Sequence, residues 1–358
     1  MSTMSLTPTP RRVAPLLLLM LATAGCSGSR LQAPAAKAPC APCEQPPVAE
    51  APPRSPADPG DVTLAELDRA LAQWDAAQAS GRMAEADALA QRIAALTDGA
   101  YALVAGAARG ERGQAGTYVG TMALAFSKRP EATAVVADRL AERDVGLVAN
   151  ALVALKLRAD PATPLAPIVA HVASPHADLR RYAPLALARV LEARRRTSEP
   201  LDPVLASQAL QRLLHTRQDQ DPIVRLHVAR ALGELGGPEA AAALLAMVGD
   251  TSSRVALGAA AALARCGDRP GFERVLHLLH NSTPDAQPLV AGTLVVYAER
   301  LQGGPLSAAE ISYLGASAPA WGRWYAEFVK RQPAATPAPR PLAVPPVRVP
   351  RGAARSGS

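Results

Sequence analysis

The chain has 358 residues, is rich in proline and poor in aromatic residues, and carries a formal net charge of +7. The positive excess lies at the two ends. Arg11 and Arg12 precede the first apolar run, and residues 328–358 hold six basic residues and no acidic one, so the rest of the chain is close to neutral. Because this excess belongs to the terminal segments and not to the folded part of the chain, we do not expect nucleic acid as a partner.

The first 25 residues have the organisation of an export signal. The two arginines are followed by an apolar run at 13–22 and by small residues up to Cys26. This run is too short to cross a bilayer as a helix of the mature protein. The segment resembles a bacterial lipoprotein signal with a lipobox ending at Cys26, although Thr23 stands where leucine is commonest. The alternative is an ordinary secretory signal that is cut nearby.

The resemblance implies that residues 1–25 are removed and that the thiol of Cys26 receives a diacylglycerol. Several acyl chains would hold the protein firmly, because each buried methylene contributes about 0.8 kcal/mol. Ser27 follows the cysteine, and by the sorting rule of the family this favours the outer membrane, facing the periplasm. We therefore expect an exported protein that is lipid-anchored in the bacterial cell envelope.

Proline-rich segments flank the part of the chain that can fold. Residues 26–62 form a Pro/Ala-rich tether and residues 333–358 a basic, Pro-rich disordered tail, since neither has a periodic apolar face. Cys40 and Cys43 in the tether lack the βαβ pattern of a redox enzyme, so we expect a local disulfide or a link between two chains. The tail is either solvated or in contact with anionic envelope polymers or lipid headgroups.

A helical hairpin is predicted at 63–98. Gly81 marks its turn, and Trp74 together with alanine and leucine residues gives it an apolar face that faintly resembles a tetratricopeptide hairpin. Because a solenoid needs terminal units with a polar outer side, we interpret this hairpin as an N-terminal cap.

Residues 99–332 repeat a pair of helices. The clearest copy begins at Asp221 and Pro222, continues with an apolar stripe of helical period, and ends at Gly236. The pattern returns 31 residues later and again after a further 31, and it recurs earlier with looser spacing, with residues 192–203 interpreted as an insertion. The equivalent core positions are Leu124, Leu152, Leu187, Leu232, Leu263 and Leu294. Such repetition predicts an all-α solenoid of helix pairs.

The pattern at 221–236 resembles the HEAT repeat, especially the short bacterial type also found in phycobilisome lyases. In that family the second helix of each pair lines a concave surface, and aspartate and arginine side chains bond between neighbouring repeats. The resemblance implies this role for Arg225 and for its counterpart Arg180. Ala256 stands where the next arginine belongs, so no continuous series of such bonds is expected. Pro184 is predicted to kink its helix.

The last helical segment is rich in aromatic residues. Ser307 and Glu310 predict a capping box at 307–310. One helical face then carries aromatic residues at i, i+3, i+4 and i+7, namely Trp321, Trp324, Tyr325 and Phe328. We interpret this face as the seal of the last repeat, and the alternative is a face that docks a partner.

No catalytic or metal-binding motif is found. His277 and His280 stand at i, i+3, but no acidic or cysteine residue completes a ligand set at a recognisable spacing. We therefore expect no enzyme activity and no cofactor, and predict a scaffold that binds an envelope protein through its concave face. The candidate contact residues are Arg180, Arg181, Arg225, His227, Arg230, Trp321 and Trp324. The alternatives are a lyase or assembly factor like the phycobilisome relatives, and a structural lipoprotein that contacts the cell wall.

Overall fold

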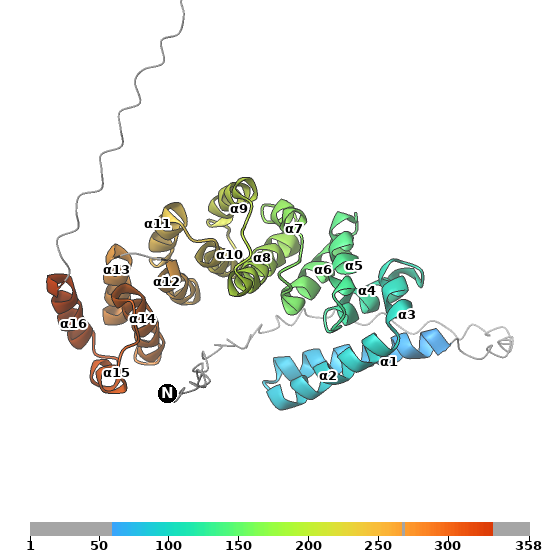
Figure 1. The fold of residues 1–358 in the computed structure, drawn as a ribbon, viewed down its shortest axis with the longest axis horizontal. Helices are drawn as coiled ribbons and strands as arrows, with labels where there is room; N and C mark the ends of the chain where they lie inside the picture. The colour runs from blue at the N-terminus through green and yellow to red at the C-terminus, as the bar shows by residue number, and fades with distance from the viewer. Residues whose placement is uncertain (1–58, 267–268, 332–358) are drawn as a thin grey trace, which may run out of the picture. The chain divides into compact units, whose positions relative to one another are not determined.

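The computed structural model describes residues 59–266 and 269–331 (Figure 1). The signal segment, Cys26, Cys40, Cys43, most of the tether and the tail lie outside these residues. The described part consists of sixteen α-helices and one short 3₁₀-helix, with no strand. The predicted all-α class is therefore confirmed. None of the helices in these two ranges combines the length and the apolar character needed to cross a bilayer.

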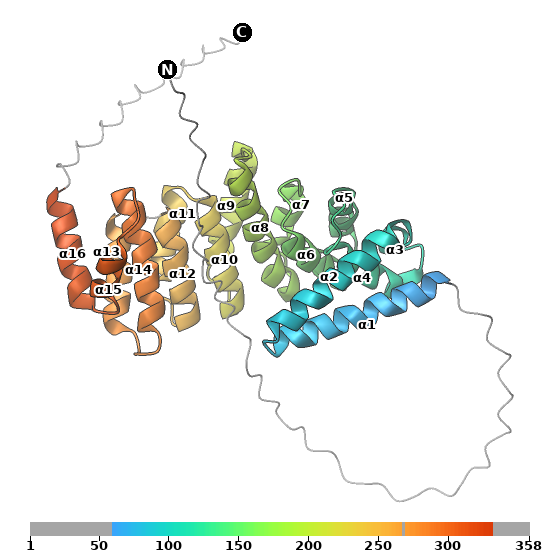
Figure 2. The same ribbon diagram turned by 60° about the horizontal axis from the view of Figure 1, so that its bottom comes forward.

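The chain divides into two compact units, residues 1–216 and 217–358. The sequence predicts one continuous solenoid over 99–332, and the division falls inside it, between the helix that ends at Thr216 and the helix that begins at Pro222. In both units, helices that follow one another in the chain pack in pairs (Figures 1 and 2). This confirms the predicted solenoid of helix pairs.

The first unit begins with the antiparallel hairpin of α1 and α2, which packs against α4. Pairs of helices follow: α3 with α4, α5 with α6, and α7 with α8, with α9 beside α7. The second members α4, α6 and α8 also pack side by side, which joins one pair to the next. The helices are α1 (Pro59–Ala79), α2 (Met83–Gly99), α3 (Tyr101–Ala108), α4 (Gly113–Leu124), α5 (Glu131–Asp138), η1 (Arg139–Ala141), α6 (Val145–Arg158), α7 (Leu165–His171), α8 (Ala177–Thr197) and α9 (Pro203–Thr216).

In the second unit, α10, α12 and α14 pack side by side, while α11 and α13 cover them from one side. Two further helices, α15 and α16, complete the unit, and α16 packs against α13. The helices are α10 (Pro222–Leu235), α11 (Pro238–Met247), α12 (Ser253–Cys266), α13 (Arg269–Asn281), α14 (Gln287–Gln302), α15 (Ala308–Leu314) and α16 (Ala318–Arg331).

The six leucines aligned by the repeat lie in the core. Each is at most 1% exposed, although they come from six different helices. Burying a leucine side chain of this kind contributes about 1.5–3 kcal/mol. The repeat alignment is therefore confirmed at the positions on which the stability of the fold depends most.

Local signals also placed several helix ends correctly. The Asp221 carboxylate accepts a hydrogen bond of 2.8 Å from the backbone N–H of Ile223, and Gly236 ends the helix with φ of 70°. The capping box of Ser307 and Glu310 is present at α15. The interpretation of residues 192–203 as an insertion was only partly right, because α8 continues to Thr197.

Gly233 and Gly292 lie in helix interiors for different reasons. A Cβ at Gly233 in α10 would lie 2.7 Å from the Cβ and 3.0 Å from the Cα of Ala262, whereas a Cβ at Gly292 in α14 would meet nothing within 4 Å. We expect Gly292→Ala to raise the free energy of unfolding by about 0.5–1 kcal/mol, since alanine favours a helix more than glycine does. Gly233→Ala should lower it by about 1–3 kcal/mol through overpacking. Urea unfolding of both variants tests the pair, and equal shifts would contradict the assigned packing.

Candidate interaction surface

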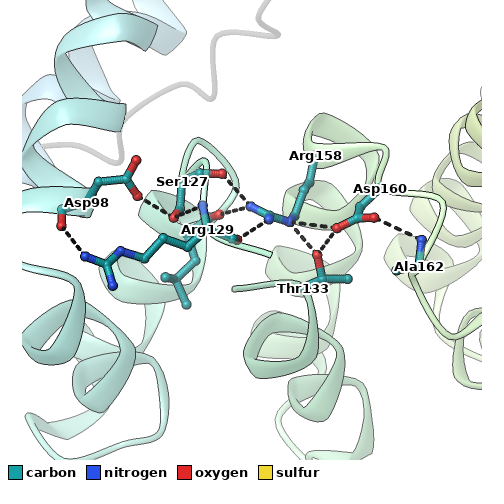
Figure 3. Close-up of polar contacts among 8 residues, drawn as sticks. Asp98, Ser127, Arg129, Thr133, Arg158, Asp160 and Ala162 are labelled. Carbon is teal, nitrogen blue, oxygen red and sulfur yellow. Dashed lines mark hydrogen bonds and ion pairs between the residues drawn. The ribbon is translucent and has the colours of Figure 1, made fainter. Parts of the chain in front are cut away.

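Arg158 is the centre of a polar network that joins three helix pairs of the first unit (Figure 3). It is the last residue of α6, and its side chain is only 8% exposed. Its guanidinium donates to the carbonyls of Leu124 at 3.1 Å and Ser127 at 2.6 Å, and also to the carbonyl of Arg129. One side chain therefore satisfies the backbone at the end of the preceding repeat, where helical carbonyls lack partners of their own.

The same guanidinium continues the network toward the next repeat. Its Nε donates to the Thr133 hydroxyl at 2.6 Å and lies 3.6 Å from the Asp160 carboxylate. The Thr133 hydroxyl donates in turn to Asp160, which accepts a 2.9 Å bond from the backbone N–H of Ala162 (Figure 3). A buried arginine with this many partners orders the loops around it.

Arginines near helix ends make equivalent contacts in successive repeats. Arg129 donates to the carbonyl of Asp98 at 3.4 Å, and Arg194 donates to that of Thr163 at 3.1 Å. Like the contact from Arg158 to Ser127, each of these spans 31 residues. In the second unit, Arg265 forms an ion pair of 3.1 Å with Glu234, again 31 residues away. We did not predict this series from the sequence, although basic residues in the last turns of α6, α8 and α12 were a signal for three of its members.

Arg225 and Arg180 hold loops in a matching way. Arg225 donates to the carbonyls of Asp219 and Gln220, and Arg180 to those of Ser174 and Pro175. Arg225 also makes two bonds of 2.8 Å to the Asp250 carboxylate, which precedes α12 in the next repeat. The inter-repeat role implied for Arg225 is therefore confirmed, and this guanidinium is used within the fold.

The Arg225–Asp250 pair makes stability depend on pH. Arg225 lowers the pKa of the Asp250 carboxyl below its ordinary value of 3.8, and the backbone N–H of Ser252 lowers it further. A depressed pKa contributes stability that is complete above pH 3.8 and is lost as the pH falls through the folded-state pKa. When the pH is lowered below 3.8, we expect the free energy of unfolding, measured with urea, to fall less in Asp250→Asn than in the parent protein. If the free energy of unfolding falls equally with pH in both proteins, the Arg225–Asp250 pair does not contribute to the pH dependence.

The other candidate contact residues differ in how accessible they are. His227 is 9% exposed and Trp321 is 0% exposed, which leaves these two side chains little surface for contact with a partner. Arg181 and Arg230 are half-buried and have interactions within the chain. Trp324 is half-buried and stacks on Phe328 with the ring centroids 5.4 Å apart.

The aromatic residues of α16 pack around Phe272 of α13. Tyr325 stacks on this ring at 4.6 Å, and Trp321 and Trp324 lie 6.2 and 5.6 Å from it. The indole N–H of Trp321 donates to the carbonyl of Gly315 at 3.0 Å, which joins the start of α16 to the end of α15. The aromatic face therefore packs inward, as expected of the seal of the last repeat.

His277 and His280 line a shallow, open hollow of about 370 Å³ with Glu273, Leu276, Ala318 and Pro319. Across the described residues, no three His, Cys, Asp or Glu side chains are grouped so that they could hold a metal ion. Cys266 is half-buried, and burial raises the pKa of its thiol. The hollow offers surface for contact but no set of reactive groups.

A family model for HEAT repeats matches residues 162–264 and 206–291. No curated protein matches the chain significantly. Among solved structures, an engineered protein is 20% identical with a TM-score of 0.40, covering 57% of this chain and 98% of that one. A designed armadillo repeat protein in complex with the peptide (KR)4 is 15% identical with a TM-score of 0.37, covering 65% and 99% of the two chains. Human deoxyhypusine hydroxylase in complex with glycerol is 17% identical with a TM-score of 0.27, covering 76% and 98%.

These TM-scores are too low to support an argument about function. The repeat architecture is indicated instead by the family match and by the helix pairs of the structure. Both identify the same architecture, in which stacked pairs expose an extended surface suited to binding other proteins. Residues 162–291 match HEAT repeats, and the helix pairs of the described residues have the architecture of a repeat solenoid.

Proposed function

We propose that this protein is a non-enzymatic interaction scaffold, held by lipid in the bacterial cell envelope, that binds a partner protein through the exposed face of its second helices. One observation supports the binding role most directly. On α6, Leu152 and Leu155 are fully buried, whereas Val153 and Leu157 remain half-exposed on another face of the same helix. Stacking such helices places their exposed faces next to one another, which gives a broad surface without a closed pocket.

The anchoring part of the proposal is supported by the signal-like sequence that ends at Cys26. We expect the protein to incorporate labelled palmitate in a bacterial host and to fractionate with membranes. Cys26→Ala should abolish the labelling, and Cys266→Ala is the matched control that should retain it. Labelling that survives in Cys26→Ala would disprove the anchor.

The binding part is tested by crosslinking in intact cells. We expect a photo-crosslinking residue at Leu185, on the exposed face of α8, to capture one dominant protein. The same residue at Gln208, exposed on α9, is the control. Capture at Gln208 without capture at Leu185 would contradict binding through the second helices.

A further inference from the structure

Basic side chains are concentrated on two neighbouring second helices of the first unit. Together α6 and α8 hold eight basic and two acidic residues, whereas the α1–α2 hairpin holds three basic and seven acidic residues. Three of the eight, Arg158, Arg180 and Arg194, donate to backbone carbonyls and stabilise loops. Lys156 and Arg189 make no such backbone contact among the hydrogen bonds of the described residues.

Lys156 and Arg189 come from two helices that pack side by side, and the charge of Arg189 acts on Lys156. Lys156 is half-buried, and burial lowers the pKa of its ammonium, as does the positive charge of Arg189. Asp75 of α1 is the carboxylate that acts against this shift. Arg189 donates to Glu192 at 2.6 Å, but the same carboxylate also accepts from Arg196. The acidic groups nearby therefore only partly compensate the positive charge at this point.

Apolar side chains accompany the two cations. Val153 lies one turn before Lys156 on α6, and Leu185 lies one turn before Arg189 on α8. Both are half-exposed, and α6 and α8 pack side by side. Val153, Lys156, Leu185 and Arg189 together form what we term the α6–α8 face. Partly desolvated cations beside apolar surface favour an anion that arrives with apolar neighbours of its own.

We propose that the α6–α8 face binds an acidic segment of a partner protein, whose carboxylates contact Lys156 and Arg189 while its apolar side chains pack on Val153 and Leu185. This inference depends on the proposed scaffold function and specifies its partner by chemistry. Carboxylates of a bound segment would supply the negative charge that Asp75 and Glu192 only partly provide. Binding of this kind weakens as salt concentration rises.

A direct binding measurement tests the proposal on the full mature chain. The probe is a short fluorescent peptide of alternating glutamate and leucine, and its binding is followed by anisotropy. We expect Lys156→Gln with Arg189→Gln to weaken binding at least about tenfold, since it removes both of the charge contacts that the acidic peptide would make. The charge-preserving pair Lys156→Arg with Arg189→Lys should keep most of the affinity.

Control variants distinguish binding at the α6–α8 face from a general effect of the protein's positive charge. Lys128→Gln with Arg143→Gln removes the same charge from two exposed loop positions outside α6 and α8 and should leave binding unchanged. A peptide of alternating lysine and leucine should not bind. An equal loss in both double variants, or no loss in Lys156→Gln with Arg189→Gln, would overturn the proposal. Thermal melting of each variant shows whether lost binding reflects lost folding.

The crosslinking experiment distinguishes this inference from the scaffold function. If Leu185 captures a protein and capture survives Lys156→Gln with Arg189→Gln, the scaffold function stands and the acidic-segment inference is wrong. If capture is lost in that variant only, and the crosslinked segment is rich in Asp and Glu, the inference is supported. If Leu185 captures nothing while Gln208 does, the scaffold face itself is misassigned.

Discussion

Replacing Arg158 with alanine is expected to lower the free energy of unfolding by about 3–4 kcal/mol. The substitution removes the donor for three loop carbonyls and leaves the Asp160 carboxylate without its cation in a mostly buried position. Because these contacts join the end of α6 to the end of α4 and to α5, the loss should appear as faster amide exchange in α4, α5 and α6 together. Urea unfolding followed by circular dichroism measures the size of the loss, and hydrogen exchange measures its location.

The control for Arg158 is Arg92, whose ion pair with Glu66 lies at the surface with side chains 56% and 35% exposed. Arg92→Ala should cost less than about 1 kcal/mol, since exposed pairs contribute little. Arg158→Lys should recover only part of the loss, because one ammonium cannot replace a planar group with five donors. A cost for Arg158→Ala as small as that for Arg92→Ala would show that the network does not hold the repeats together.

Replacing Trp321 with alanine is expected to cost about 3–5 kcal/mol in the second unit. The side chain is fully buried against Phe272, and its indole N–H satisfies the carbonyl of Gly315. The cavity and the lost hydrogen bond both lie where α15 and α16 close the unit. We therefore expect these two helices to lose protection in hydrogen exchange, while amides of α10 remain protected.

Tyr313 provides the matched control for Trp321, because it is an aromatic residue of α15 that is 66% exposed. Tyr313→Ala should change stability by no more than about 0.5 kcal/mol. Trp321→Phe keeps an aromatic ring but removes the donor to Gly315, and it should fall between the two alanine variants. Unaltered protection of α15 and α16 in Trp321→Ala would mean that the aromatic cluster is not the seal of the unit.

Features that depend on neighbours in the chain were predictable. The cap at Asp221, the stop at Gly236 and the capping box at Ser307 each involve residues within one helical turn. The buried leucines were predictable because the apolar residues have helical spacing and the pattern returns after 31 residues. Such signals need no knowledge of how the repeats stack, because the backbone dihedrals and side-chain spacing of a single helix decide them.

The accessibility of individual polar residues was harder to predict. His227 lies among charged residues on the predicted polar face, yet residues 226–229 of α10 are all buried. A helix inside a stack is covered on its flanks by the next second helix as well as by its own partner, so the polar stripe is narrower than a helical wheel suggests. Trp321 was assigned to the correct helical face, but only the position of Phe272 shows that this face points inward.

The all-α class, the helix pairs, the core leucines and the similarity of residues 221–236 to HEAT repeats were predictable without the structure, because they depend on local propensity and on periodicity. The stacking of the repeats decides which arginines stabilise loops within the fold. Arg158 reaches carbonyls 29 to 34 residues away in the chain. Lys156, two residues earlier, is half-buried, and the positive charge of Arg189 on another helix acts on it. Contacts over such distances exist only once the repeats stack, and this stacking gives two basic residues of one helix different surroundings.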